Sequence, residues 1–143
     1  KKIEVKEVKS EAQQQAEDRI SSLRREILTR LSEGNVASAA DMYLQHAKEN
    51  DSQPLPKQAM LDIANQLMSS GNWTNAAQAY EKFLSYYGSY EFSEQVMLML
   101  GIIYGRYLSD SKKAIEYLKK AVGKLSDPAQ KKMCEDEIRR LET

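Results

Sequence analysis

The feature of this sequence that most constrains its fold is an internal repeat with a period of about 37 residues. The offset is kept by different residue types: Gly34 to Gly71 and Tyr43 to Tyr80 by 37 positions, and Ala76 to Ala114 by 38. Chance does not preserve one offset across several residue types. The chain is therefore expected to be built from repeated units, each packing on its neighbours.

Each repeat predicts two helices joined by a tight turn. In the second repeat, apolar residues recur at steps of three and four, which is the period of one helix face: Met60, Ile63, Ala64 and Leu67. Gly71 is expected to end that helix in a left-handed conformation, and Asn72 to cap the next helix through its side chain. Only 6 Gly and 3 Pro occur in 143 residues, which leaves little turn material for strands and favours an all-α class.

Small residues stand where two helices are expected to cross closely, with large aromatic side chains filling the remaining space. The small positions are Ala76, Gly101, Ala114 and Ala121, and the large neighbours are Trp73, Tyr80 and Tyr104. A last helix is predicted after Asp127-Pro128, with Asp127 as cap and proline at the first helical position. Its apolar side is Met133, Cys134, Ile138 and Leu141.

These patterns predict the organisation of the chain. Residues 1–18 form a polar lead segment or an extension of the first helix, and residues 19–143 form one helical-repeat domain. Hairpins are expected at about 19–49, 56–87 and 91–125, and a capping helix at about 128–142. A helical-repeat array needs such a polar-backed terminal helix.

The second and third repeats resemble the tetratricopeptide repeat family. Gly71-Asn72-Trp73 stands at the family's turn, and Leu100-Gly101 stands at its Leu-Gly position. The third repeat has one extra turn residue, and the first carries Glu26 and Arg30 where apolar residues are expected. The resemblance implies a right-handed superhelical stack of about three hairpins plus the capping helix. It also implies a scaffold that binds proteins and is not an enzyme.

The resemblance further implies a concave groove built from the first helix of each hairpin. The matching positions form the predicted peptide-binding face: Arg24, Leu28, Leu31, Leu61, Asn65, Met68, Leu98, Ile102 and Arg106. Family members that clamp a terminal carboxylate use Lys, Asn and Arg at five positions. The residues at these positions here are Arg24, Leu28, Asp62, Gln95 and Met99, and four of the five do not match the clamp. The groove is expected to take an apolar peptide or helix of a partner. Alternatively, its own N-terminal segment fills it, or a second copy in a homodimer.

Catalytic, metal and cofactor sites are not expected. His46 and Cys134 are the single histidine and cysteine, so no His/Cys nucleophile pair or multi-histidine metal site is supported. His46 is predicted to be partly buried and Cys134 to lie in the core or half-buried. Asp136 and Glu137 are interpreted as solvated surface.

The charge pattern does not favour nucleic acid. The 21 basic and 21 acidic residues balance, although residues 51–110 carry a net −3 and residues 111–143 a net +3. The lysines of the second region alternate with acids such as Glu116 and Glu135, which is typical of a solvated face.

The context of the chain is also constrained. No apolar run is long enough to insert into a membrane, and no signal peptide precedes Lys1, which suggests a fragment or processed form. Leu98–Tyr104 followed by Leu125–Pro128 is similar to soluble tails of some bacterial membrane proteins, rhomboid-type ones among them. This resemblance implies a cytoplasmic or membrane-tethered soluble domain.

Overall fold

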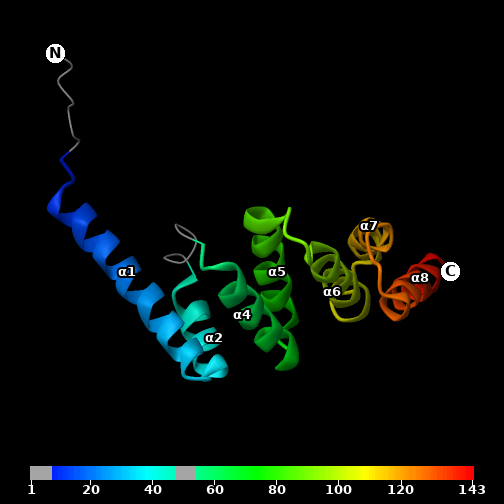
Figure 1. The fold of residues 1–143 in the computed structure, drawn as a ribbon, viewed down its shortest axis with the longest axis horizontal. Helices are drawn as coiled ribbons and strands as arrows, with labels where there is room; N and C mark the ends of the chain where they lie inside the picture. Colours follow the sequence, from blue (N-terminus) through cyan, green and yellow to red (C-terminus); the bar gives the residue numbers. More distant parts are fainter. Residues whose placement is uncertain (1–7, 48–53) are drawn as a thin grey trace, which may run out of the picture. The chain divides into compact units, whose positions relative to one another are not determined.

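The computed structural model describes residues 8–47 and 54–143, and within these ranges all regular structure is helical (Figure 1). The helices are α1 (Glu11–Ser32), α2 (Val36–Gln45), α4 (Lys57–Ser69), α5 (Trp73–Tyr87), α6 (Ser93–Arg106), α7 (Ser111–Val122) and α8 (Pro128–Glu142). Helix α1 pairs with α2, α4 with α5 and α6 with α7, and α8 packs on α7. The predicted all-α class of helical hairpins is confirmed. The chain divides into two compact units, one ending at Leu55 and one beginning at Pro56.

The first unit consists of α1 and α2. Ser10 caps α1 through a capping box. Its hydroxyl accepts a hydrogen bond from the Gln13 backbone N–H, and the Ser10 backbone N–H donates to Gln13 Oε1. Residues 11–18 are therefore part of α1, whereas residues 1–7 of the predicted lead segment and 48–49 of the first predicted hairpin lie outside the described residues. Glu26 and Arg30, which depart from the family pattern, form an i,i+4 ion pair of 2.6 Å.

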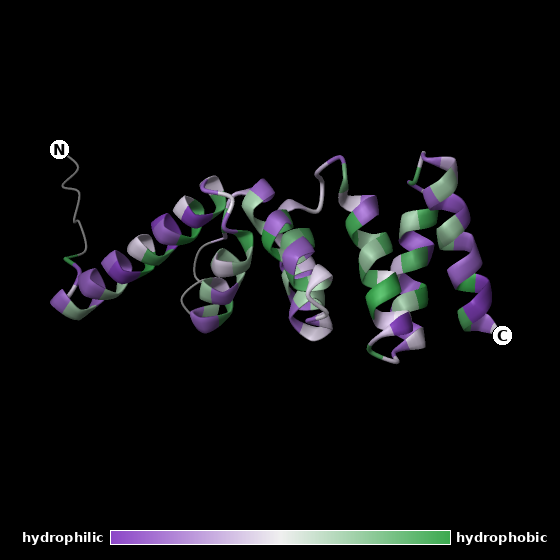
Figure 2. Ribbon diagram, turned by 90° about the horizontal axis from the view of Figure 1, so that it is seen from below, coloured by the Kyte–Doolittle hydropathy of each residue, from purple (hydrophilic) through white to green (hydrophobic). Residues whose placement is uncertain are grey.

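The second unit is a continuous packing of α4, α5, α6, α7 and α8. The apolar stripe predicted for α4 is buried, and Tyr80 and Phe83 of α5 are among the largest fully buried side chains. At the C-terminal end, α8 is largely hydrophilic, as expected for a helix that closes a repeat array (Figure 2). Its buried Cys134 joins the core of α6 and α7, and Met133, predicted on the same side, is 49% exposed instead.

Two of the turns use glycine and one does not. Gly34 and Gly71 adopt φ of 80° and 78°, which confirms the left-handed helix end predicted at Gly71. In the third hairpin, Ser109 takes this role with φ of 53°. A serine in the left-handed region is strained relative to glycine. The third turn, which has one extra residue, thus reverses the chain with a left-handed serine where the other two turns use glycine.

The predicted caps are only partly confirmed. Asp127 accepts from the Gln130 backbone N–H at 3.0 Å, as predicted. Asp110, which was not predicted as a cap, accepts from the Lys113 backbone N–H at 3.1 Å. The cap prediction for Asn72 is wrong, because its side chain accepts from Asn75 Nδ2 at 2.9 Å and makes no bond to the backbone. An amide neighbour three residues ahead competes with the backbone donors that an aspartate would bind.

Helices α6 and α7 cross at Gly101. A Cβ atom added there would lie 2.4 Å from Leu118 Cδ2 and 2.5 Å from its Cγ, and Leu118 is fully buried. The other predicted small positions, Ala76, Ala114 and Ala121, are also fully buried. At Gly101, the sequence expectation that a small residue permits close helix approach is confirmed.

Side-chain contacts on α5 connect the second hairpin to the third. Glu81 accepts hydrogen bonds from the Tyr104 and Tyr117 hydroxyls at 2.6 and 2.8 Å, and Lys113 Nζ lies 3.2 Å away. Partial burial acts to raise the Glu81 pKa, but the three hydrogen bonds together hold the pKa below its usual value. A carboxylate of α5 thus holds α6 and α7.

At the start of α5, two aromatic rings make a second connection. Trp73 stacks on Tyr107, with centroids 3.7 Å apart and planes at 9°. The start of α5 is thereby fixed to the residue that follows α6.

We predict that Gly101→Ala destabilises the protein by about 1–3 kcal/mol, because the added methyl group must displace a buried leucine. Gly123→Ala is the matched control, since Gly123 has a helical φ of −72° and open space around a Cβ atom. That change should stay within about 1 kcal/mol of the unchanged protein, on the stabilising side. Denaturant unfolding measures both variants, and equal stabilities would contradict the close crossing.

We also predict a specific acid sensitivity from Glu81. The pKa of Glu81 is lower in the folded state than in the unfolded state. Its contribution to the free energy of unfolding is therefore complete above the unfolded pKa of about 4.3, and it is lost as pH falls through the lower folded pKa. Glu81→Gln should therefore be less stable at neutral pH and lose less stability on acidification. Thermal melts across this pH range test the prediction, and parallel curves for the two proteins would refute it.

Candidate functional site

An open apolar groove lies between α4, α5 and α6. Its cavity has a volume of about 270 Å³ and is lined by Leu61, Asn65, Tyr80, Phe92, Gln95, Val96 and Met99. Leu61 and Asn65 come from the predicted peptide-binding face, and Gln95 and Met99 are positions compared above with the carboxylate clamp. The groove lies within the second unit, where helix packing fixes its walls.

Tyr80 and Asn65 form a hydrogen-bonded pair in this groove. The Tyr80 hydroxyl donates to Asn65 Oδ1 and lies 3.8 Å from Met68 Sδ. Burial raises the pKa of Tyr80 to about 12, so its hydroxyl stays protonated and orients the Asn65 amide. Asn65 Nδ2 has no hydrogen-bond partner among the described residues, and neither does the buried Gln95 Oε1.

Phe92 forms a wall of the groove that the sequence analysis did not identify. It precedes α6 and is 47% exposed, with its ring 5.4 Å from that of Tyr90. Its spacing to Val96 and Met99 is the four-then-three step of one helix face, which was the available signal. Tyr80 was interpreted as packing alone, yet it also lines the groove.

One predicted residue of α6 lies in the core and not on an open face. Leu98 is 3% exposed, inside a core with Leu118 and Cys134, so its placement on the open face is corrected. Ile102 is half-buried and packs against the edge of the same core. Helix α6 is apolar on most of its circumference, and periodicity alone does not select the face that stays accessible.

Arg106, the last predicted residue of α6, is bound to α8. Its Nε and Nη2 donate to Glu137 Oε1, the former at 2.9 Å, and Arg140 Nη2 donates to Glu137 Oε2 at 3.0 Å. Burial acts to raise the Glu137 pKa, but the two arginines outweigh it and lower the pKa overall. The prediction that Glu137 is solvated surface is wrong, because it is 3% exposed, whereas Asp136 is exposed as predicted.

The three remaining predicted residues belong to the first unit. Arg24, Leu28 and Leu31 are half-buried on α1, and Arg24 Nη2 donates to the Pro54 carbonyl at 2.7 Å. Their participation in one groove with the residues of the second unit stays a prediction.

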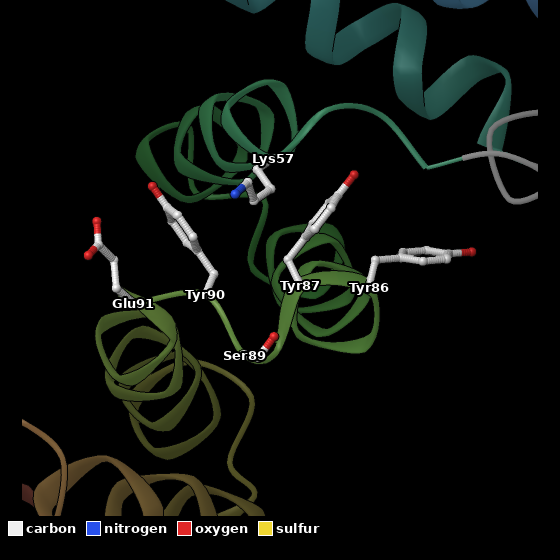
Figure 3. A pocket seen from close by; sticks show the side chains of 6 residues that line it. All are labelled: Lys57, Tyr86, Tyr87, Ser89, Tyr90 and Glu91. Atoms are coloured by element: carbon white, nitrogen blue, oxygen red, sulfur yellow. The ribbon is translucent and has the colours of Figure 1, made fainter.

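A second cavity of about 390 Å³ lies at the α5–α6 turn, lined by Lys57, Tyr86, Tyr87, Ser89, Tyr90 and Glu91. Figure 3 shows Tyr87 and Tyr90 on two sides of the opening, with Lys57 beside Tyr90 and Tyr86 directed away. Lys57 Nζ is 4.3 Å from the Tyr90 ring centroid. The lysine thus already occupies one cation–π position on this ring.

The described part of the chain brings together no three His, Cys, Asp or Glu side chains that could hold a metal ion. His46 is half-buried and Cys134 fully buried, as expected. Burial, followed by the nearby Glu135 charge, raises the pKa of the Cys134 thiol, which makes it a poor nucleophile. Among the described helices, none has the length and apolar character to cross a bilayer.

Comparisons with known proteins agree with the fold. Residues 58–89, which contain α5 and all of α4 except Lys57, match the tetratricopeptide repeat family model. A crystal structure of PcrH from Pseudomonas aeruginosa aligns with a TM-score of 0.57 and 13% identity, covering 89% of this chain and 94% of that chain. No curated protein matches. The second hairpin is thus similar to a tetratricopeptide repeat by sequence, the wider fold is similar to PcrH by structure, and the membrane-protein resemblance gains no support.

We predict that Glu137 and its neighbour Asp136 differ sharply in their effect on stability. Glu137→Ala should cost about 1–2 kcal/mol, because it removes a buried acceptor shared by two half-exposed arginines. Asp136→Ala should leave the melting temperature unchanged, since its partners Lys132 and Arg139 are exposed. Equal effects of the two alanine substitutions would contradict the assigned roles.

Proposed function

We propose that this protein is an interaction module that binds an extended, apolar segment of a partner protein in the groove between α4, α5 and α6. The observation that carries the proposal is the apolar cavity left open on this unit, with the unpaired Nδ2 group of Asn65 in its lining. The repeat match and the structural similarity support the fold that the proposal needs, because stacked helical hairpins form extended concave surfaces.

The apolar walls favour an apolar side chain as the occupant. Leu61 and Met99 are half-buried and Phe92 is about half-exposed, so a ligand side chain would remove further apolar surface from water. The unbranched thioether of Met99 adapts to different side-chain shapes. The cavity volume is slightly below the lower end of small-molecule sites, which suits one large side chain of a longer segment.

The unpaired Asn65 amide favours an extended segment over a regular helix. A peptide group in extended conformation offers a free C=O to Asn65 Nδ2. In the interior of an α-helix that carbonyl is already bonded within the helix.

The experiment selects displayed peptides on the unchanged protein and measures the affinity of the strongest one by calorimetry. Met99→Glu should weaken binding at least tenfold, because a charge in the apolar groove loses its hydration, while helical circular dichroism is unchanged. Met133→Glu is the matched control, since Met133 is 49% exposed and outside the groove. Leu98 is avoided, because a charge there would disrupt the core.

Equal binding by the Met99→Glu variant would refute the groove as the site. Light scattering after gel filtration tests the alternative that a second copy fills the groove. A dimer of the unchanged protein that dissociates in the Met99→Glu variant would assign the groove to self-association instead.

A further inference from the structure

A basic cavity lies beyond the apolar groove, at the end of α6. It has a volume of about 410 Å³ and is lined by Gly105, Arg106, Tyr107 and Arg140. Two guanidinium groups here share the single carboxylate of Glu137, so the three side chains together carry a net charge of +1. Neither arginine forms an ion pair with another described residue.

Both arginines retain unused hydrogen-bond donors. Glu137 engages Nε and Nη2 of Arg106 and of Arg140, and Arg140 Nη2 also lies 3.5 Å from the Gly105 carbonyl. A guanidinium has five N–H donors, so the Nη1 groups of both residues remain without a described partner. The side chains are 53% and 49% exposed, which leaves these donors accessible from solvent.

The buried carboxylate positions the two arginines without neutralising them. Glu137 is nearly inaccessible and lies against both side chains, which fixes long residues that would otherwise lose conformational freedom on binding. An acidic ligand would therefore meet an organised pair of guanidinium groups. Charge complementarity favours a carboxylate as the occupant.

The basic cavity is in register with the apolar groove. Arg106 follows Met99 by seven residues, which is two turns on the same face of α6 and about 10 Å along its axis. An extended peptide in the polyproline II conformation covers about 9 Å in three residues, and its three residues per turn place side chains i and i+3 on the same side. One extended segment can thus place an apolar side chain in the groove and a second side chain at the arginines.

We propose that the partner segment carries an aspartate or glutamate three residues from its apolar anchor, and that Arg106 and Arg140 bind this carboxylate. The inference rests on the proposed function and specifies the sequence that the groove selects. Of the two arginines, Arg106 alone is in the predicted face, and neither stands at a position of the family's carboxylate clamp.

Two pairs of capped synthetic peptides test the inference by nuclear magnetic resonance titration. One pair contains Leu-Ser-Ser-Glu or Leu-Ser-Ser-Gln, and the other contains the reversed orders. In one of the two orders, the Glu peptide should bind about fivefold more tightly than its Gln counterpart at low salt. Both members of that pair should shift the Leu61 and Met99 methyl signals.

Variants separate recognition from structure. Arg140→Gln should abolish the preference for Glu, and Arg139→Gln, on the exposed side of the same helix, should keep it. Glu137→Gln raises the net charge of the cluster to +2 and should enlarge the preference, provided that its thermal melt shows a folded protein. If Arg106 and Arg140 had a structural role alone, the Glu137→Gln variant would show no increase in the preference for the Glu peptide.

Three outcomes overturn the inference. Equal affinities for the Glu and Gln peptides, with the methyl signals still shifted, would refute the acidic specificity and leave the proposed function intact. No methyl shift with any peptide would count against both. Inorganic phosphate that shifts the Arg106 and Arg140 side-chain signals as strongly as the Glu peptide would identify a general anion site.

Discussion

The close crossing of α6 and α7 at Gly101 is the constraint on which the second unit depends. Without a side chain at this position, Leu118 packs directly on the α6 backbone and the two helices form one layer. Their contact then supports α8 on one side, while α6 still presents Val96 and Met99 to α4 and α5 on the other. Helix α6 thus packs on α7 and α8 with one side and forms a wall of the groove with the other.

Most of the fold could be predicted from local patterns. The repeat offset, the left-handed Gly71 and the Asp127-Pro128 helix start all correspond to backbone constraints that single residues satisfy. Asn72 shows the limit of this reasoning, since a neighbouring amide bonds its side chain in place of the backbone. The sequence shows that both the backbone N–H and a neighbouring amide could bond the Asn72 side chain, but it does not show which of the two does.

The candidate site was less predictable than the fold. Leu98 and Met99 are adjacent apolar residues of one helix, yet Leu98 belongs to the core and Met99 to the groove. Which face is covered depends on α7 and α8, which are distant in the sequence. Glu137 looked like an ordinary surface acid for the same reason, because Arg106 is 31 residues away.

The stacked pair of Trp73 and Tyr107 gives the molecule a built-in optical reporter. Trp73 is the single tryptophan of the chain, so intrinsic indole emission arises from one place. Its stacking partner also lines the basic cavity beside Arg106. Displacement of the Tyr107 ring, by unfolding or by a bound molecule, therefore alters the surroundings of the indole. The intrinsic fluorescence of Trp73 thus reports on changes at the end of α6 without any attached dye.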